Sequence, residues 1–120
     1  MSAQSAILVV EDEDSIRLTL RDYLKKKGHE VFVASDGVGA IKQMLDHPVA
    51  LVITDYRMDL LGGDYWIRFL HEFCRDKKVI ITSGFLQPEF AIPFPVVYKP
   101  YDYSELEALV RKILGEKDNA

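Results

Sequence analysis

The sequence LVITDYR at residues 51–57 decides the fold, because it joins a short apolar run directly to an acidic residue, Asp55. Three similar runs also end on polar residues, namely ILVVED at 7–12, VIITS at 79–83 and VVYKP at 96–100. Apolar runs of this length without strict alternation predict strands buried on both faces of a parallel sheet. The carboxyl ends of parallel strands lie along one edge of the sheet, so the polar residues are expected to meet there.

Amphipathic segments separate these runs, which predicts alternating strands and helices. The first helix is expected to be capped by Asp14 and to end before Gly28, which suits the left-handed position after a helix. A second strand is expected at residues 31–34, and the helix after it should be stopped by His47 and Pro48. The chain therefore predicts βα units wound around one sheet.

The two remaining helices are expected after the third and fifth strands. The first of these helices should turn one apolar side toward the core, and that side consists of Trp66, Phe69, Leu70 and Phe73. The start of the last helix has two equally good capping boxes, Ser104 with Glu107 and Asp102 with Glu105.

The segment between the fourth and fifth strands is expected to be irregular. Prolines stand at positions 88, 93 and 95, and a proline inside a helix costs about 3 kcal/mol. We therefore predict a shortened or missing fourth helix, with at most one turn around residues 89–91. The apolar residues of this segment either seal the gap or form a partner patch: Phe85, Phe90, Ile92 and Phe94.

Length and composition are typical of a single globular domain. With 120 residues, 48% of them hydrophobic, it is expected to form a single domain, 1–120, with a core of about 5–115 and no output domain. A net charge of −4 disfavours nucleic acid as a partner. No apolar run approaches the roughly 20 residues that span a bilayer, and there is no signal peptide, so a cytoplasmic protein without a membrane partner is expected.

Cysteine and histidine offer no other site. The only cysteine, Cys74, excludes a disulfide framework and a cysteine-based zinc site. His29, His47 and His71 share no metal-ligand spacing and are expected to be exposed.

The polar strand ends suit phosphoryl chemistry. Glu11, Asp12 and Asp55 would bring three carboxylates together, and a Mg²⁺ ion, which prefers oxygen ligands, would relieve their repulsion. The carboxylate of Asp55 can attack a phosphoryl group to form an acyl phosphate. A hydroxyl at the end of the fourth strand and the ammonium of Lys99 would then contact the phosphoryl oxygens.

Taken together, these motifs resemble a response-regulator receiver domain of the CheY-like family. The resemblance extends over roughly residues 5–115 and rests on five motifs in order: ILVVED at 7–12, DYRM at 55–58, Gly63, ITSG at 81–84 and KPY at 99–101. It implies an α/β fold of the flavodoxin-like (CheY-like) type, a doubly wound five-stranded parallel sheet in the order 2-1-3-4-5.

The resemblance also implies a role for each matching position. Asp55 would be the phosphoacceptor, with Asp12 as a direct metal ligand and Glu11 acting through water. Arg57 would give a metal ligand through its backbone carbonyl, and Lys99 would contact the phosphoryl group. The switch hydroxyl would be Ser83, with Thr82 as the second candidate. The bond between Lys99 and Pro100 is expected to be cis.

The expected function is signal relay rather than enzymatic turnover of a substrate. A histidine kinase or histidine phosphotransfer protein would phosphorylate Asp55 with Mg²⁺, and the changed conformation would alter binding to a downstream protein. Several positions depart from the family: Asp59 replaces a usual proline, Val96 replaces a usual aromatic, and Arg57 places a cation beside the acceptor. The alternative is a receiver-fold binding module that does not need phosphate.

Two other classes of protein are excluded by residues at the strand ends. A haloacid-dehalogenase-type phosphohydrolase needs an acid two residues after its aspartate, where Arg57 stands. A flavodoxin binds the phosphate of its flavin in the loop after the first strand, where the acids at residues 11–14 would repel it.

Overall fold

All five expected strands form one parallel sheet. The computed structural model describes residues 6–58, 60–84 and 92–115. The sheet has the order β2-β1-β3-β4-β5, as predicted. Its strands are β1 (Ala6–Val10), β2 (Val31–Ala34), β3 (Val49–Asp55), β4 (Lys78–Ser83) and β5 (Val96–Tyr98), each parallel to its neighbours.

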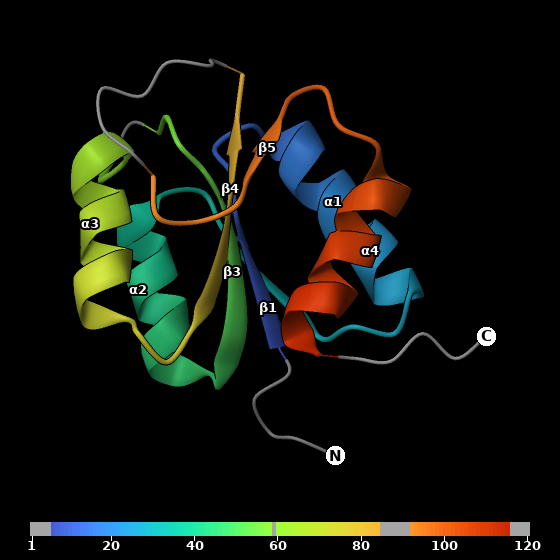
Figure 1. The fold of residues 1–120 in the computed structure, drawn as a ribbon, viewed down its shortest axis with the longest axis horizontal. Helices are drawn as coiled ribbons and strands as arrows, with labels where there is room; N and C mark the ends of the chain where they lie inside the picture. The colour runs from blue at the N-terminus through green and yellow to red at the C-terminus, as the bar shows by residue number, and fades with distance from the viewer. Residues whose placement is uncertain (1–5, 59, 85–91, 116–120) are drawn as a thin grey trace.

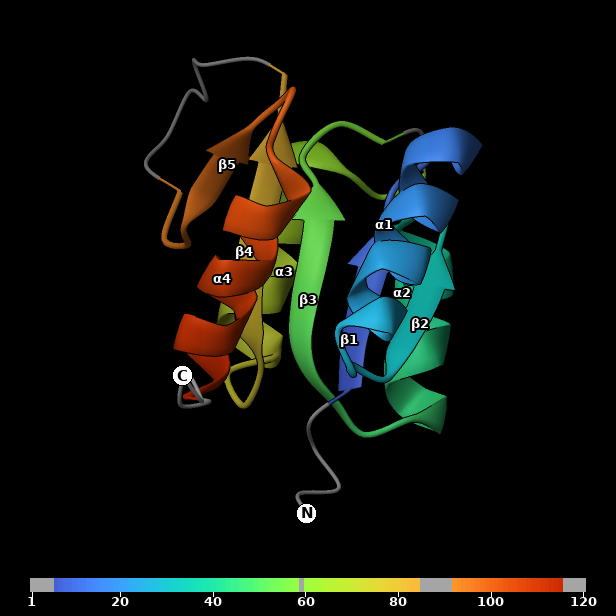
Figure 2. The same cartoon turned by 90° about the vertical axis from the view of Figure 1, so that its right-hand side faces the viewer.

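Helices cover both faces of this sheet, as Figures 1 and 2 show. They are α1 (Asp14–Lys26), α2 (Gly37–Asp46), α3 (Gly63–Phe73) and α4 (Tyr103–Leu114). The helices α1 and α4 lie on one face, and α2 and α3 lie on the other. Each face has its own apolar cluster, centred on Leu20, Leu24 and Val110 on the first face and on Trp66, Ile67 and Leu70 on the second.

The central strands are buried because both of their faces are covered. Every residue of β1 is at most 1% exposed, and in β3 Leu51 and Ile53 face α1 and α4 while Val52 faces α2 and α3. This explains why the strands lack an alternating pattern in the sequence.

Side-chain caps begin two of the helices. Asp102 accepts hydrogen bonds from the backbone N–H groups of Ser104 at 2.7 Å and Glu105 at 3.3 Å, which selects one of the two capping boxes expected for α4. The expectation that Asp14 caps α1 is wrong by one residue. Asp14 is the first residue of the helix and pairs with Arg17 at 2.7 Å.

Two expectations about burial are also wrong. Phe73, expected in the core, is 73% exposed; it is the last residue of α3, where the helix ends. His29, expected to be exposed, has a side chain only 5% exposed, and its Nε2 lies 2.9 Å from the carboxylate of Glu107. An acid on α4 thus provides a buried partner for a histidine that is 78 positions away in the sequence.

The connection between β4 and β5 is short. No helix is present in its described residues, 84 and 92–95, and the turn expected around residues 89–91, like Phe85 and Phe90, lies outside the described part. Ile92 and Phe94 pack against the apolar cluster beneath α2 and α3, as expected for residues that seal the gap. The carbonyl of Pro95 accepts a hydrogen bond from the N–H of Ile81 at 2.9 Å, which joins this segment to β4.

The two ends of the described core lie at the same edge of the sheet. β1 begins at Ala6 and α4 ends at Leu114, both at the edge opposite the carboxyl ends of the strands (Figures 1 and 2). Among the described residues, no helix is long and apolar enough to cross a membrane.

Candidate functional site

Three carboxylates meet where β1 and β3 end. Glu11 and Asp12 follow β1 directly, Asp55 ends β3, and the pairing of Val10 with Thr54 places these strand ends side by side. One carboxylate oxygen from each acid lies within 4.8 Å of the others. Asp12 is exposed, whereas Glu11 and Asp55 are 4% and 7% exposed. This set of oxygen donors, open on the Asp12 side, fits a hexacoordinate Mg²⁺ that keeps some of its waters.

Lys99 enters the same cluster from the end of β5. Its Nζ lies 2.8 Å from Oε1 of Glu11 and 3.2 Å from Oδ2 of Asp55. Its backbone N–H donates to the carbonyl of Ser83 at 2.8 Å, and the bond to Pro100 is cis, as predicted. Lys99 therefore supplies the positive charge that two nearly buried carboxylates require.

Burial and neighbouring charges together shift the pKa values of Asp55, Glu11 and Lys99. Burial raises the pKa of Asp55 and of Glu11, although Lys99 acts in the opposite direction on both. Burial alone would lower the pKa of Lys99, but its contacts with Glu11 and Asp55 outweigh burial and raise it. A divalent cation would favour the ionised form of both acids.

Glu11 also accepts hydrogen bonds from groups other than Lys99. Its Oε2 accepts a hydrogen bond from the N–H of Glu13 at 3.1 Å, and its backbone carbonyl accepts one from Nη1 of Arg17 at 2.9 Å. The second guanidinium nitrogen of Arg17 pairs with Asp14. Arg17 thus fixes the acidic turn from outside the cluster, a role that sequence reasoning missed although its spacing from Glu11 and Asp14 suits such contacts.

Thr82 and Ser83 lie at the end of β4, beside the acceptor strand. They are 3% and 5% exposed, and Asp55 is paired with Thr82 in the sheet. The backbone N–H of Tyr56 donates to the carbonyl of Thr82 at 2.9 Å. Both hydroxyl-bearing residues are therefore at the site, and the preference for Ser83 as the switch hydroxyl stays a prediction.

The loop after Asp55 is tightly constrained. A Cβ atom on Gly62 would lie 2.7 Å from the backbone nitrogen of Met58, so only glycine fits this close approach. The hydroxyl of Tyr56 donates to the carboxylate of Asp64 at the start of α3. Arg57 is exposed and, with Asp12, lines an open pocket beside the acids. This places residue 57 next to the three carboxylates, and its backbone carbonyl as a metal ligand stays a prediction.

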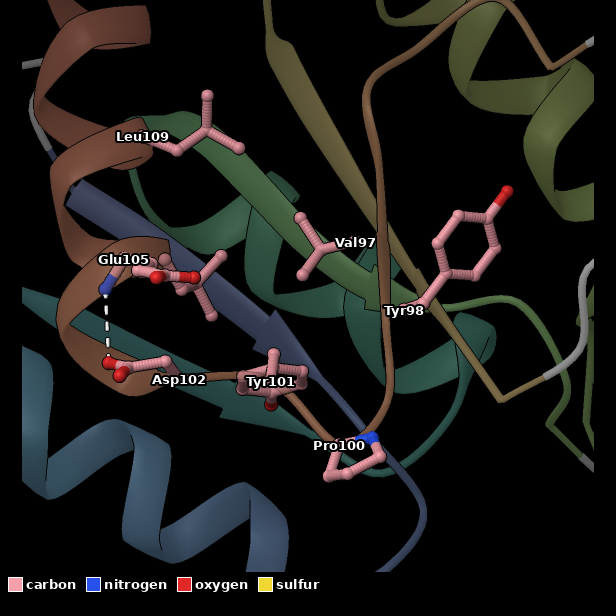
Figure 3. A pocket seen from close by; sticks show the side chains of 8 residues that line it. Val97, Tyr98, Pro100, Tyr101, Asp102, Glu105 and Leu109 are labelled. Carbon is pink, nitrogen blue, oxygen red and sulfur yellow. Dashed lines mark hydrogen bonds between the residues drawn. The ribbon is translucent and has the colours of Figure 1, made fainter.

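The residues of β5 alternate between the two faces of the sheet. Val96, in the usual aromatic position, is half-buried against the cluster beneath α2 and α3. Val97 points toward α4, whereas Tyr98 points away from α4 and is 45% exposed (Figure 3). The pocket between β5 and α4 is also lined by Tyr101 and Leu109. Tyr98 thus lies on the same side of β5 as Val96 but is far more accessible.

The family model for the response regulator receiver domain matches residues 7–111. The chain belongs to this family. It is a receiver domain of two-component signalling, and the fold predicted from the sequence is the one that its solved relatives share.

Individual relatives of this receiver domain differ in size. The sensor kinase CckA of Brucella abortus is 30% identical over 98% of this chain but only 13% of its own length. Sporulation initiation phosphotransferase F of Bacillus subtilis is 25% identical over 94% of this chain and 96% of its own length. The solved response regulator TrrA of Thermotoga maritima, in complex with Mg²⁺ and BeF, has a TM-score of 0.81 and 27% identity, covering 92% of this chain and 99% of that one.

Many relatives are therefore longer than this receiver domain. The chain spans 13% of sensor kinase CckA, 26% of the regulatory protein AtoC of Escherichia coli and 52% of the transcriptional regulatory protein YxdJ of Bacillus subtilis.

Proposed function

We propose that this receiver domain accepts a phosphoryl group on Asp55 from a phosphohistidine of a partner protein, with Mg²⁺ bound by the neighbouring acids. The observation that carries the proposal is the arrangement of Glu11, Asp12 and Asp55 with Lys99 at the carboxyl edge of the sheet. A nucleophilic carboxylate, a cation site and a fixed ammonium are the groups that phosphoryl transfer to aspartate requires.

In the proposed reaction a carboxylate oxygen of Asp55 attacks the phosphorus atom. An O–P bond forms while the P–N bond to the partner's imidazole breaks, and the imidazole, already protonated on its other ring nitrogen, leaves as the neutral base. Lys99 lies 3.2 Å from Asp55 and is placed to bind an oxygen of the transferred group. The carboxylates of Asp12 and Glu11 would hold Mg²⁺, which neutralises charge on the transferring oxygens when it is bound.

The relatives support this assignment. TrrA was solved with Mg²⁺ and BeF, and the sensor kinase and phosphotransferase relatives carry names that describe phosphoryl transfer. The expected donor is therefore a histidine kinase or a histidine phosphotransfer protein. The phosphorylated domain would act by binding a further protein.

The direct test is formation of an adduct that depends on Asp55. The protein is incubated with beryllofluoride or acetyl phosphate at millimolar Mg²⁺, and the adduct is followed by mass spectrometry for phosphate and by ¹⁹F NMR for beryllofluoride. We expect a phosphoryl adduct on the wild-type protein and none on Asp55→Asn. Asp46→Asn, which changes an exposed aspartate at the end of α2, serves as the matched control and should react like the wild type.

A wild-type protein that forms no adduct under these conditions would rule out the proposal. The receiver-fold binding module that needs no phosphate would then be the better description. Two features point toward that alternative: Val96, which has no ring to rotate between two positions, and the proline-rich segment that replaces the usual fourth helix.

A further inference from the structure

A chain of two buried hydrogen bonds connects α3 to the acceptor residue. The indole nitrogen of Trp66 donates to Oγ1 of Thr54 at 2.9 Å, and that hydroxyl donates to the backbone carbonyl of Asp55 at 3.1 Å. Thr54 and Trp66 are both 0% exposed. Both hydrogen bonds therefore lie in the core, between α3 and the end of β3.

The indole, the hydroxyl and the carbonyl can form these two hydrogen bonds in only one donor-to-acceptor direction. An indole N–H can only donate and a backbone carbonyl can only accept. The hydroxyl of Thr54 must therefore accept from Trp66 and donate its single proton to Asp55. Both buried polar side chains are satisfied in this way, and a core position that could hold an apolar residue carries a specific polar contact instead.

The second bond acts on the peptide group that follows the acceptor. The carbonyl of Asp55 accepts from Thr54, while the N–H of Tyr56 donates to the carbonyl of Thr82 at 2.9 Å. The peptide between Asp55 and Tyr56 is thus held from two sides, by α3 through Thr54 and by β4 through Thr82. This peptide is attached to the Cα atom that carries the carboxylate, so its orientation limits the backbone conformation of Asp55.

We propose that Thr54 and Trp66 are positioning residues for Asp55, holding the acceptor peptide in the orientation that forms the adduct. The inference rests on the proposed function, because it concerns the geometry of the same acceptor. It also assigns α3 a direct link to the site. The ring centroids of Trp66 and Phe69 lie 6.0 Å apart, and those of Phe69 and Phe73 lie 5.6 Å apart. Phe73 is exposed at the end of the helix.

Thr54 offers a nearly isosteric test. Thr54→Val removes the hydroxyl and keeps the branched shape, Thr54→Ser keeps the hydroxyl, and Thr19→Val removes an exposed hydroxyl on α1 as a control. Dissociation constants for beryllofluoride at saturating Mg²⁺ are measured by calorimetry. We expect Thr54→Val to weaken binding about three- to tenfold, which corresponds to one lost hydrogen bond. Thr54→Ser and Thr19→Val should stay within about twofold of the wild type.

The only tryptophan of the chain provides a second readout that a purely structural role would not change. In an ¹⁵N-labelled protein it gives a single indole N–H resonance. We expect this resonance to shift when the wild-type protein forms the adduct and to shift in the same way in Thr54→Ser. In Thr54→Val it should lie upfield already in the free protein and should no longer respond to the adduct.

Thermal unfolding separates folding defects from positioning defects. If Thr54→Val does not fold, Trp66→Phe replaces it, since this variant removes the indole donor and retains an aromatic ring; it should weaken binding about twofold or more. Equal affinity and an equal indole response in wild type and Thr54→Val would overturn the inference. A wild-type protein without any adduct would overturn the proposed function and this inference together.

Discussion

The two faces of the sheet use buried polar groups for different purposes. Beneath α1 and α4, the pair of His29 and Glu107 joins the loop after α1 to the middle of α4. Beneath α2 and α3, the pair of Thr54 and Trp66 is hydrogen-bonded to the backbone of Asp55, the proposed acceptor. The first pair joins two parts of the fold, and the second is the one proposed to position Asp55.

This difference shows that burial alone does not indicate a role in the site. Both pairs are nearly inaccessible to solvent, and both connect distant positions of the sequence. Only the pair on the α2 and α3 face is continuous with Asp55. The variants below test how far the two faces differ, from the largest expected effect to the smallest.

Removing the largest buried side chain should give the largest loss of stability. We expect Trp66→Ala to lower the free energy of unfolding by about 3–5 kcal/mol, because it creates a cavity and removes the donor to Thr54. Leu24→Ala, on the opposite face, should cost about 2–5 kcal/mol through the cavity alone. Urea denaturation measures both, and the exposed Phe73→Ala should stay within about 0.5 kcal/mol of wild type.

Breaking the buried pair on the α1 and α4 face should be the next largest effect. Glu107→Leu leaves His29 buried without its partner and should lower the free energy of unfolding by about 3 kcal/mol. The double variant His29→Leu with Glu107→Leu should recover much of this loss, since no polar group of the pair then remains buried. If the effects of His29→Leu alone and Glu107→Leu alone add up to the effect of the double variant, the two residues are not coupled. Adduct formation should change little in any folded variant.

The pH dependence of stability tests the acid cluster. Because burial raises the pKa of Asp55, the folded protein binds more protons than the unfolded chain between the ordinary and the raised value. Stability therefore falls as pH rises through this range, and the loss is complete above the raised pKa. Without Mg²⁺, Asp55→Asn should be more stable than wild type at neutral pH, with the difference shrinking in acid. Thermal melts across pH would contradict this if the difference grew as pH fell.

The helix caps should give the smallest effects, one on each face. Asp102 caps α4, and Asp36 caps α2 by accepting a hydrogen bond from the N–H of Gly39 at 2.7 Å. We expect Asp102→Ala and Asp36→Ala each to cost about 1 kcal/mol, measured by urea denaturation. A loss in Asp36→Ala much larger than in Asp102→Ala would show that the start of α2 has a further role.

The sheet and the position of the site could be predicted because both depend on local patterns. Each strand is a short apolar run, and each polar residue of the site follows such a run directly. Parallel pairing then brings Glu11, Asp55 and Lys99 to one edge without further information. The cap of α4 could be reduced to two choices but not decided, since both boxes satisfy the same local rule.

The remaining contacts depend on packing between distant segments. His29 was expected to be exposed because nothing near it in the sequence indicates that Glu107 will cover it. The contact between Thr54 and Trp66 requires the register of α3 against β3, which periodicity does not specify. Phe73 follows the helical spacing of a core residue, yet it is the last residue of α3 and is largely exposed.

The position of Ala6 and Leu114 at the edge opposite the acids has a practical consequence for protein engineering. A fluorescent protein, a surface anchor or a second domain fused before Ala6 or after Leu114 would attach at the far end of the molecule from Asp55. Such fusions should leave access to the carboxyl edge open. The receiver domain is therefore suited to be one exchangeable domain of a longer designed polypeptide.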